Sequence, residues 1–210
     1  MQHSRNLNPP LHLHEVVTSR SVDASHRVFV FWNTTIGKKV VMAVTGVGFV
    51  GFVIAHMLDN LKIFAGPDEI NAYSRFLREV GRPEFGYGQL LWLVRIVLLV
   101  CVTLHITAAL QLTLMSRAAR PAGYTTKRDI ETTWAARAMR WCGVLLLAFI
   151  VFHLLHLTGG VVGFEAGQFK DLAVYQSVVA AFAVWPIALF CIVAMGALCL
   201  HLDHGIGWLR

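Results

Sequence analysis

Residues 89–116 read QLLWLVRIVLLVCVTLHITAALQLTLMS, an almost unbroken apolar run that decides what kind of protein this chain can be. A helix that crosses about 30 Å of hydrocarbon needs about 20 residues of this kind. Three further apolar segments also reach about this length, at about 40–58, 138–158 and 172–202. We therefore expect an all-α fold, an integral membrane helical bundle whose four transmembrane helices run up and down in antiparallel order.

The composition excludes other classes of protein. Of the 210 residues, 56% are apolar and 14% are charged, whereas an ordinary soluble domain has about 25% charged residues. The chain is therefore neither a typical soluble globule nor a disordered segment. The positive-inside rule explains the net charge of +6, so we expect a lipid bilayer as partner and no nucleic acid. The four cysteines have no CxxC spacing and indicate neither a disulfide framework nor a zinc site.

The basic residues also predict the orientation. Residues 1–37 form an N-terminal segment that lacks the pattern of a signal peptide, and residues 38–210 form the transmembrane domain. Twelve of the 18 Lys and Arg lie on the side of the N-terminus and six on the other side. We therefore expect a multi-pass protein of the cytoplasmic or inner membrane, with a cytoplasmic N-terminus and outer loops at 59–88 and 159–171. The first loop is amphipathic enough to include a short interfacial helix.

Histidines provide the functional signal. An ionisable side chain inside a transmembrane segment is costly and usually functional. Six of the ten histidines lie in the apolar segments, and every segment supplies at least one: His56, His105, His153, His156, His201 and His204. Neutral imidazole is a good iron ligand, and a haem held between two helices takes one imidazole from each. Proton relays would pair such histidines with carboxylates, which are scarce here, so electron transfer is favoured over ion transport.

Depth along the helices sorts these histidines into two levels. His56 and His153 lie within about 10 Å of the outer ends of their segments, at 1.5 Å per residue. His105 and His201 lie about 24 Å or more from the outer ends. We expect His56 to pair with His153 near the outer face, and His105 with His201 toward the inner face. By depth and spacing alone, His156 would serve as well as His153, and His204 as well as His201.

Six stretches of the sequence resemble one known family. They are similar to the membrane-anchor cytochrome b subunit of succinate dehydrogenases and fumarate reductases, of the single-subunit, two-haem type. The stretches are IGKKVVMAVTG (36–46), GFVIAHMLDNLKIFAG (51–66), NAYSRFL (71–77), LHITAALQLT (104–113), RWCGVLLLAFIVFHLLHLTGG (140–160) and LCLHLDHGIGW (198–208). The resemblance therefore covers about four-fifths of the chain.

The resemblance implies two b haems with four histidine ligands, one from each helix. The implied ligands of the haem irons are His56, His105, His153 and His201. On the third helix, the family spacing from Gly143 favours His153 over His156. On the fourth helix the family spacing favours His201, and His204 is then solvated or contacts a haem propionate.

The resemblance also implies a function. The protein would be the membrane anchor and dihaem cytochrome b subunit of a succinate:quinone oxidoreductase, complex II, and would pass electrons from an iron–sulfur subunit to menaquinone or another quinone. Succinate oxidation would belong to a partner flavoprotein, so we expect no catalytic residue for succinate in this chain. Asp59 and Asn60 are candidate quinone-binding residues, and His204, Asp203 and Trp208 form an alternative on the inner side. The basic loop between Arg117 and Arg140 is a candidate docking surface for the iron–sulfur subunit.

Departures from the family keep alternatives open. The family normally has a fifth helix, which would begin where this chain ends, although four helices can provide all four ligands. Some relatives carry no haem and hold a membrane iron–sulfur cluster, which needs cysteines as well as histidines. A dihaem cytochrome b of another quinone-linked dehydrogenase, such as a hydrogenase or formate dehydrogenase, would share the haems but not the NAYSRFL loop.

Overall fold

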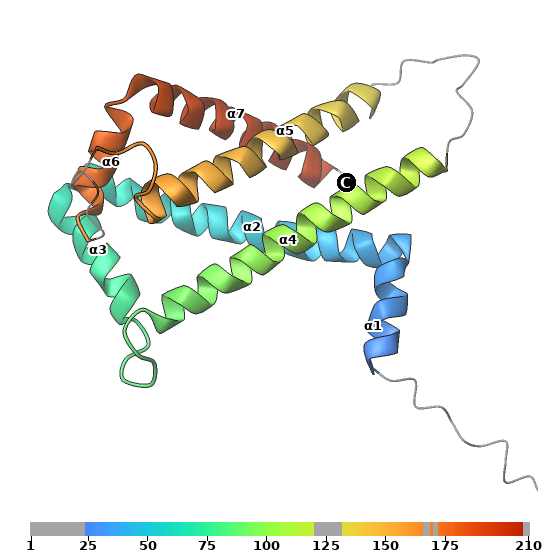
Figure 1. The fold of residues 1–210 in the computed structure, drawn as a ribbon, viewed down its shortest axis with the longest axis horizontal. Helices are drawn as coiled ribbons and strands as arrows, with labels where there is room; N and C mark the ends of the chain where they lie inside the picture. Colours follow the sequence, from blue (N-terminus) through green and yellow to red (C-terminus); the bar gives the residue numbers. More distant parts are fainter. Residues whose placement is uncertain (1–23, 120–131, 166–168, 170–171, 208–210) are drawn as a thin grey trace, which may run out of the picture.

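The computed structural model describes residues 24–119, 132–165, 169 and 172–207, and every regular element in these ranges is helical (Figure 1). The elements are α1 (Ala24–Asn33), α2 (Thr35–Asn60), η2 (Leu61–Ala65), α3 (Pro67–Glu79), α4 (Gln89–Ala118), α5 (Thr132–His153), η3 (Leu154–Thr158), α6 (Val174–Phe182) and α7 (Trp185–Gly207). Of these, η2 is a short 3₁₀ turn and η3 is a π turn that continues α5.

Four helices are long and apolar enough to cross a membrane. They cover Thr35–Ala65, Gln89–Ala118, Ala138–Thr158 and Trp185–Ile206. Only 6% to 17% of the most apolar window of each helix is buried inside the protein. Apolar surface of this extent marks contact with lipid or with other proteins rather than with water. The prediction of an all-α fold with four helices long and apolar enough to span a membrane is thus confirmed for the described residues.

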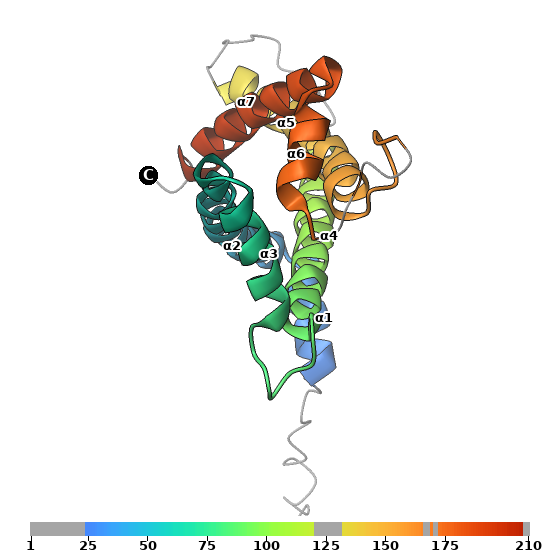
Figure 2. The same ribbon diagram turned by 90° about the vertical axis from the view of Figure 1, so that its left-hand side faces the viewer.

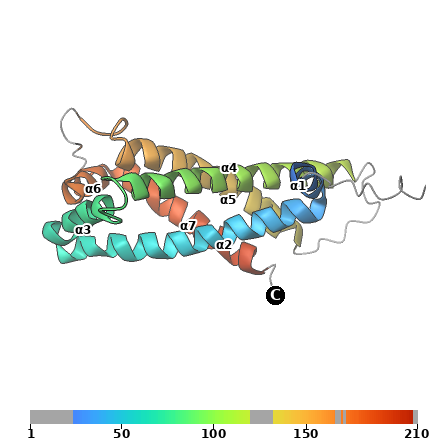
Figure 3. The ribbon, with the colours of Figure 1, turned by 90° about the horizontal axis from the view of Figure 1, so that it is seen from below.

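The first spanning helix is joined to a helix that the sequence analysis missed. The Thr34 side chain caps α2 by accepting a hydrogen bond of 2.8 Å from the backbone N–H of Gly37. The buried Lys38 donates to the carbonyl of Trp32 in α1 at 2.7 Å. Helix α1 therefore turns across the direction of α2, and Figure 3 shows it end-on beside the lengthwise spanning helices. The predicted domain boundary at residues 37/38 falls inside α2.

The prediction of one continuous helix over about 172–202 is wrong. The chain forms α6 and α7 instead, because Pro186 has no N–H and its ring prevents a helix from continuing through the preceding turn. At the second position of α7 that missing N–H needs no partner. The break also changes the depth of His201, which now lies 16 residues after the start of α7, just as His105 lies 16 residues after the start of α4. Both are about 24 Å along their helices.

The two short helices α3 and α6 lie together at one end of the molecule (Figure 2). The helix predicted in the loop 59–88 is confirmed as α3. Its Asn71 links the two connections, since Oδ1 accepts a bond of 3.1 Å from the N–H of Tyr175 and Nδ2 donates to Oε1 of Gln176 at 3.4 Å. We call this end the α3–α6 end.

The described chain consists of two helix pairs with the same plan. Helix α2 packs along α4, and α5 packs along α7. In each pair a long helix is followed by a distorted turn, a short helix and a second long helix. Within the described ranges, the long helices of one pair make few close contacts with those of the other pair, and the α3–α6 contact joins the pairs.

The link through Asn71 predicts a measurable loss of stability. Replacement Asn71→Ala removes the bond to the Tyr175 N–H and should lower the free energy of unfolding by about 1 kcal/mol. Thermal denaturation in detergent measures this change. The matched control Gln176→Ala removes only the longer, exposed contact and should have a smaller effect. Equal effects of the two substitutions would contradict the role given to Asn71.

Candidate functional site

The structure brings His56 and His153 together near the α3–α6 end, and we call them the first pair. Their ring centroids are 5.9 Å apart, with the planes at 89°. Each imidazole lies against a phenylalanine one turn earlier, Phe52 at 5.3 Å and Phe149 at 5.5 Å between centroids. Two imidazoles that share one haem iron, at about 2 Å per Fe–N bond, have centroids roughly 6 Å apart. The separation of the first pair therefore fits coordination of one iron.

His156, the alternative to His153, has a different environment. Its side chain is 1% exposed and lies between the rings of Phe152 and Phe164, at 5.0 and 4.4 Å between centroids. Its Nδ1 donates to the carbonyl of Val162 at 2.6 Å, and its Nε2 is buried without a hydrogen-bond partner. His156 thus holds the loop after α5, while His153 lies beside His56.

The second pair is His105 of α4 and His201 of α7, which lie within electrostatic range of each other. His105 Nδ1 is 2.9 Å from Oγ1 of the buried Thr45. The Thr45 hydroxyl can donate its single hydrogen to the carbonyl of Val41 at 2.7 Å, and with this arrangement Oγ1 accepts from Nδ1 of His105. The Nε2 of His105 then keeps the lone pair that a metal needs. In His201, Nδ1 is buried and has no side-chain hydrogen-bond partner, and the backbone of Met139 interacts with the ring.

Two glycines leave room beside the imidazoles of the second pair. A Cβ atom at Gly46 of α2 would lie 3.7 Å from Cε1 of His105, and one at Gly143 of α5 would lie 3.8 Å from Cε1 of His201. Any side chain larger than alanine would occupy the space next to these rings. The absence of side chains at both positions lets each imidazole approach the backbone of the neighbouring helix in its own helix pair.

The positions of these residues repeat along the chain. A glycine precedes the first-pair histidine by ten residues in both α2 and α5, and a phenylalanine precedes it by four. The corresponding residues are 97 positions apart: Gly46 and Gly143, Phe52 and Phe149, His56 and His153. The sequence analysis used the spacing from Gly143 and missed the same spacing from Gly46. Comparing the two halves of the sequence would have revealed it.

The described residues offer metal donors in pairs. Among them, no group of three or more His, Cys, Asp or Glu side chains is placed to hold a metal ion. A haem iron takes four nitrogens from its macrocycle and needs two axial ligands from the protein. Two opposed imidazoles supply that donor set, so the residues present fit a bis-histidine haem.

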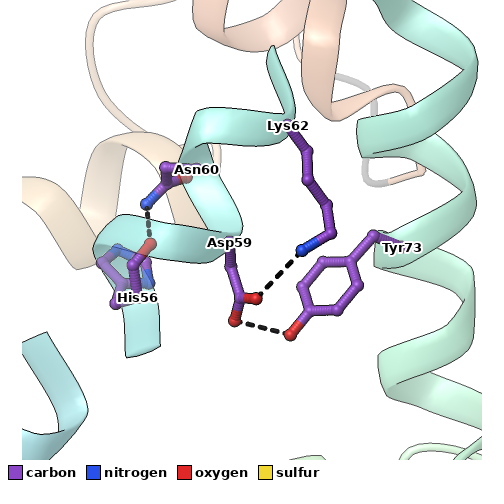
Figure 4. Close-up of polar contacts among 5 residues, drawn as sticks. All are labelled: His56, Asp59, Asn60, Lys62 and Tyr73. Carbon is purple, nitrogen blue, oxygen red and sulfur yellow. Dashed lines mark hydrogen bonds and ion pairs between the residues drawn. The ribbon is translucent and has the colours of Figure 1, made fainter. Parts of the chain in front are cut away.

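The candidate quinone-binding residues Asp59 and Asn60 belong to a polar cluster one turn beyond His56 (Figure 4). Oδ2 of Asp59 accepts a hydrogen bond of 2.5 Å from the hydroxyl of Tyr73, and Oδ1 accepts one of 3.2 Å from Nζ of Lys62. Nζ also lies 4.0 Å from the centroid of the Tyr73 ring. The Asn60 amide donates to the carbonyl of His56 at 2.8 Å. The sequence analysis missed the contribution of Tyr73, although this residue is part of the NAYSRFL motif.

The alternative quinone-binding residues on the inner side are only partly described. His204 Nδ1 donates to the carbonyl of Leu200 at 2.9 Å and lies 3.8 Å from Oδ2 of Asp203. Trp208 lies outside the described residues, as do residues 120–131 of the basic loop. Of the two candidate quinone sites, the one at the α3–α6 end is therefore the one whose groups the structure brings together.

The cluster predicts an unusual tyrosine titration. Partial burial raises the pKa of Tyr73 to about 12, and the hydrogen bond to Asp59 and the negative charge of Asp59 act in the same direction. Because folded Tyr73 binds its proton more tightly than the unfolded chain does, its stabilising contribution is complete below about pH 10 and declines as pH rises through about 12. Titration of tyrosinate absorbance should show one tyrosine near pH 12 that Tyr73→Phe removes and Asp59→Asn shifts back toward 10. If Tyr73→Phe instead removed a tyrosine that ionises near pH 10, the predicted shift of Tyr73 would be contradicted.

No protein-family model matches this chain, and no curated protein or solved structure matches it either. The functional argument therefore depends on the chain's own side chains. Its main elements are the two histidine pairs, the glycines beside the second pair and the polar cluster beyond the first.

Proposed function

We propose that this chain is the membrane-anchor, dihaem cytochrome b subunit of a succinate:quinone oxidoreductase. The observation that carries the proposal is that four apolar helices each supply one of these histidines, with the rings of His56 and His153 5.9 Å apart and His105 within electrostatic range of His201. Burying four unrelated imidazoles in an apolar bundle would need four separate compensations. Coordination of two haem irons compensates all four together.

In this proposal His56 and His153 hold one b haem, and His105 and His201 hold the other. A bound haem supplies reversible one-electron transfer, and two histidine ligands leave no open position for oxygen. Thr45 fixes the His105 tautomer, so that Nε2 is free to bind. Gly46 and Gly143 keep the space beside the second pair clear.

The proposed arrangement in the membrane is an antiparallel four-helix bundle with a cytoplasmic N-terminus and the α3–α6 end outside. The supporting observation is the excess of Lys and Arg at the opposite end. The second pair lies about 24 Å along α4 and α7, and His56 lies one turn from the end of α2. Two levels roughly 15–20 Å apart divide an electron's path across the bilayer into shorter steps.

The proposed partners are a flavoprotein, which oxidises succinate, and an iron–sulfur subunit that docks on the inner side of the cytoplasmic or inner membrane. Electrons would then reach the second pair before the first pair. The acceptor is menaquinone or another quinone. We place it beside Asn60, whose amide has one N–H beyond the bond to His56. Asp59 and Tyr73 can supply a proton at that end.

Loss of single histidines should remove single haems. His105→Ala should reduce the haem content from two to one per chain because an axial ligand is lost, and His153→Ala should do the same. His156→Ala should keep both haems, since His156 packs between two phenylalanines. Haem is counted per purified chain by the pyridine haemochrome method. An unchanged content in His105→Ala, or a haem lost in His156→Ala but retained in His153→Ala, would contradict the ligand assignment.

The quinone proposal predicts a loss of activity with haem intact. Asn60→Leu should slow quinone reduction about tenfold in the assembled complex, as expected when a hydrogen bond to the substrate is lost. The matched control Gln176→Leu changes an exposed amide at the same end and should leave the rate unchanged. If Asn60→Leu retains the full rate and His204→Leu loses it, the quinone binds on the inner side instead.

A further inference from the structure

The two helix pairs differ at the position directly before the glycine that lies beside each imidazole of the second pair. Thr45 directly precedes Gly46, and Cys142 directly precedes Gly143, again 97 residues apart. Both side chains are buried, with exposed fractions of 5% and 8%. The equivalent position in the two pairs thus holds a hydroxyl in α2 and a thiol in α5.

The surroundings of the two imidazoles are otherwise alike. The distances from a Cβ at each glycine to the facing Cε1 atom differ by only a tenth of an ångström, 3.7 Å for His105 and 3.8 Å for His201. The backbone of Met42 interacts with the His105 ring and the backbone of Met139 with the His201 ring, each four residues before its glycine. The side-chain hydrogen bonding nevertheless differs, because Nδ1 of His105 reaches Thr45 at 2.9 Å and Nδ1 of His201 has no side-chain partner.

The chemistry of the two side chains explains this difference. A hydroxyl oxygen that already donates its hydrogen to a carbonyl, as Thr45 does to Val41, is a good acceptor for an imidazole N–H. Thiol sulfur is a weak acceptor. A metal-bound histidine whose second nitrogen donates a hydrogen bond is oriented by that bond and becomes a more basic ligand.

We propose that Thr45 and Cys142 are positioning residues that make the two axial ligands of the second-pair haem unequal, a strong and oriented His105 and a weaker His201. The inference rests on the proposed function. A more basic axial ligand stabilises the oxidised iron, so the Thr45 hydrogen bond lowers the reduction potential of this haem. The thiol at Cys142 limits how far the potential falls.

The test is a redox titration of the assembled complex in its membrane, monitored by optical and electron paramagnetic resonance spectra. The step that His105→Ala abolishes identifies the second-pair haem. Thr45→Val removes the acceptor at nearly constant volume and should favour reduction of that haem three- to tenfold, about 30–60 mV for a one-electron couple. Thr45→Ser restores the acceptor and should restore the potential and the low-spin ferric signal.

Cys142→Thr should have the opposite effect, because it gives His201 the acceptor that His105 already has. The matched controls are Thr113→Val, whose hydroxyl bonds only to the carbonyl of Ala109 at 2.8 Å, and Cys191→Thr in α7. Neither should move the potential. If Thr45→Val does not assemble, Cys142→Thr alone tests the proposal. A lower reduction potential of the second-pair haem in Cys142→Thr supports the proposal, and an unchanged reduction potential overturns it.

The outcomes separate this inference from the function it rests on. Two bound haems with shifts in the stated directions support it. Two bound haems whose potentials in Thr45→Val and Cys142→Thr match those of the controls overturn it and leave the proposed function standing. A wild-type complex without haem overturns both.

Discussion

The structure depends on one constraint, which is that imidazoles held among long apolar helices need partners for their ring nitrogens. His105 meets it with Thr45 at one nitrogen, and His56 and His153 face each other at 5.9 Å. In the part of the chain that the structure describes, the long helices of the two pairs make few close contacts with each other. Two haems held between the two helix pairs would bind the free ring nitrogens of the histidines. They would also join the two helix pairs along their length.

Contacts at the α3–α6 end hold the two helix pairs together. Asn71 joins the two connections, and the Asp59, Lys62 and Tyr73 cluster fixes the end of α2 beside α3. The same cluster brings titratable groups to within one turn of His56. Structural support and the proposed quinone chemistry therefore share residues, which explains why the motif at 71–77 is rich in side chains with long-range contacts.

The length and hydropathy of the apolar segments predicted most of the fold, while local interactions of single residues determined the rest. The four spanning helices follow from apolar length alone, but Pro186 divides the last segment because one missing N–H outweighs the apolar pattern. Sequence depth placed the histidines on two levels and left His153 and His156 equivalent. The structure separates them, because His153 lies beside His56 and His156 packs between Phe152 and Phe164. The roles of Thr45 and Tyr73 depend on contacts between residues 60 and 14 positions apart, which no local pattern predicts.

The central claim is that the paired histidines hold two haems, and the most direct test is the reduced-minus-oxidised optical spectrum of the purified full-length protein with its haem-to-protein ratio. The account predicts the spectrum of low-spin b haem, two haems per chain and reduction in two resolved steps. A protein that folds in the membrane and purifies without haem absorption would contradict it. A single haem per chain would contradict the pairing on two levels.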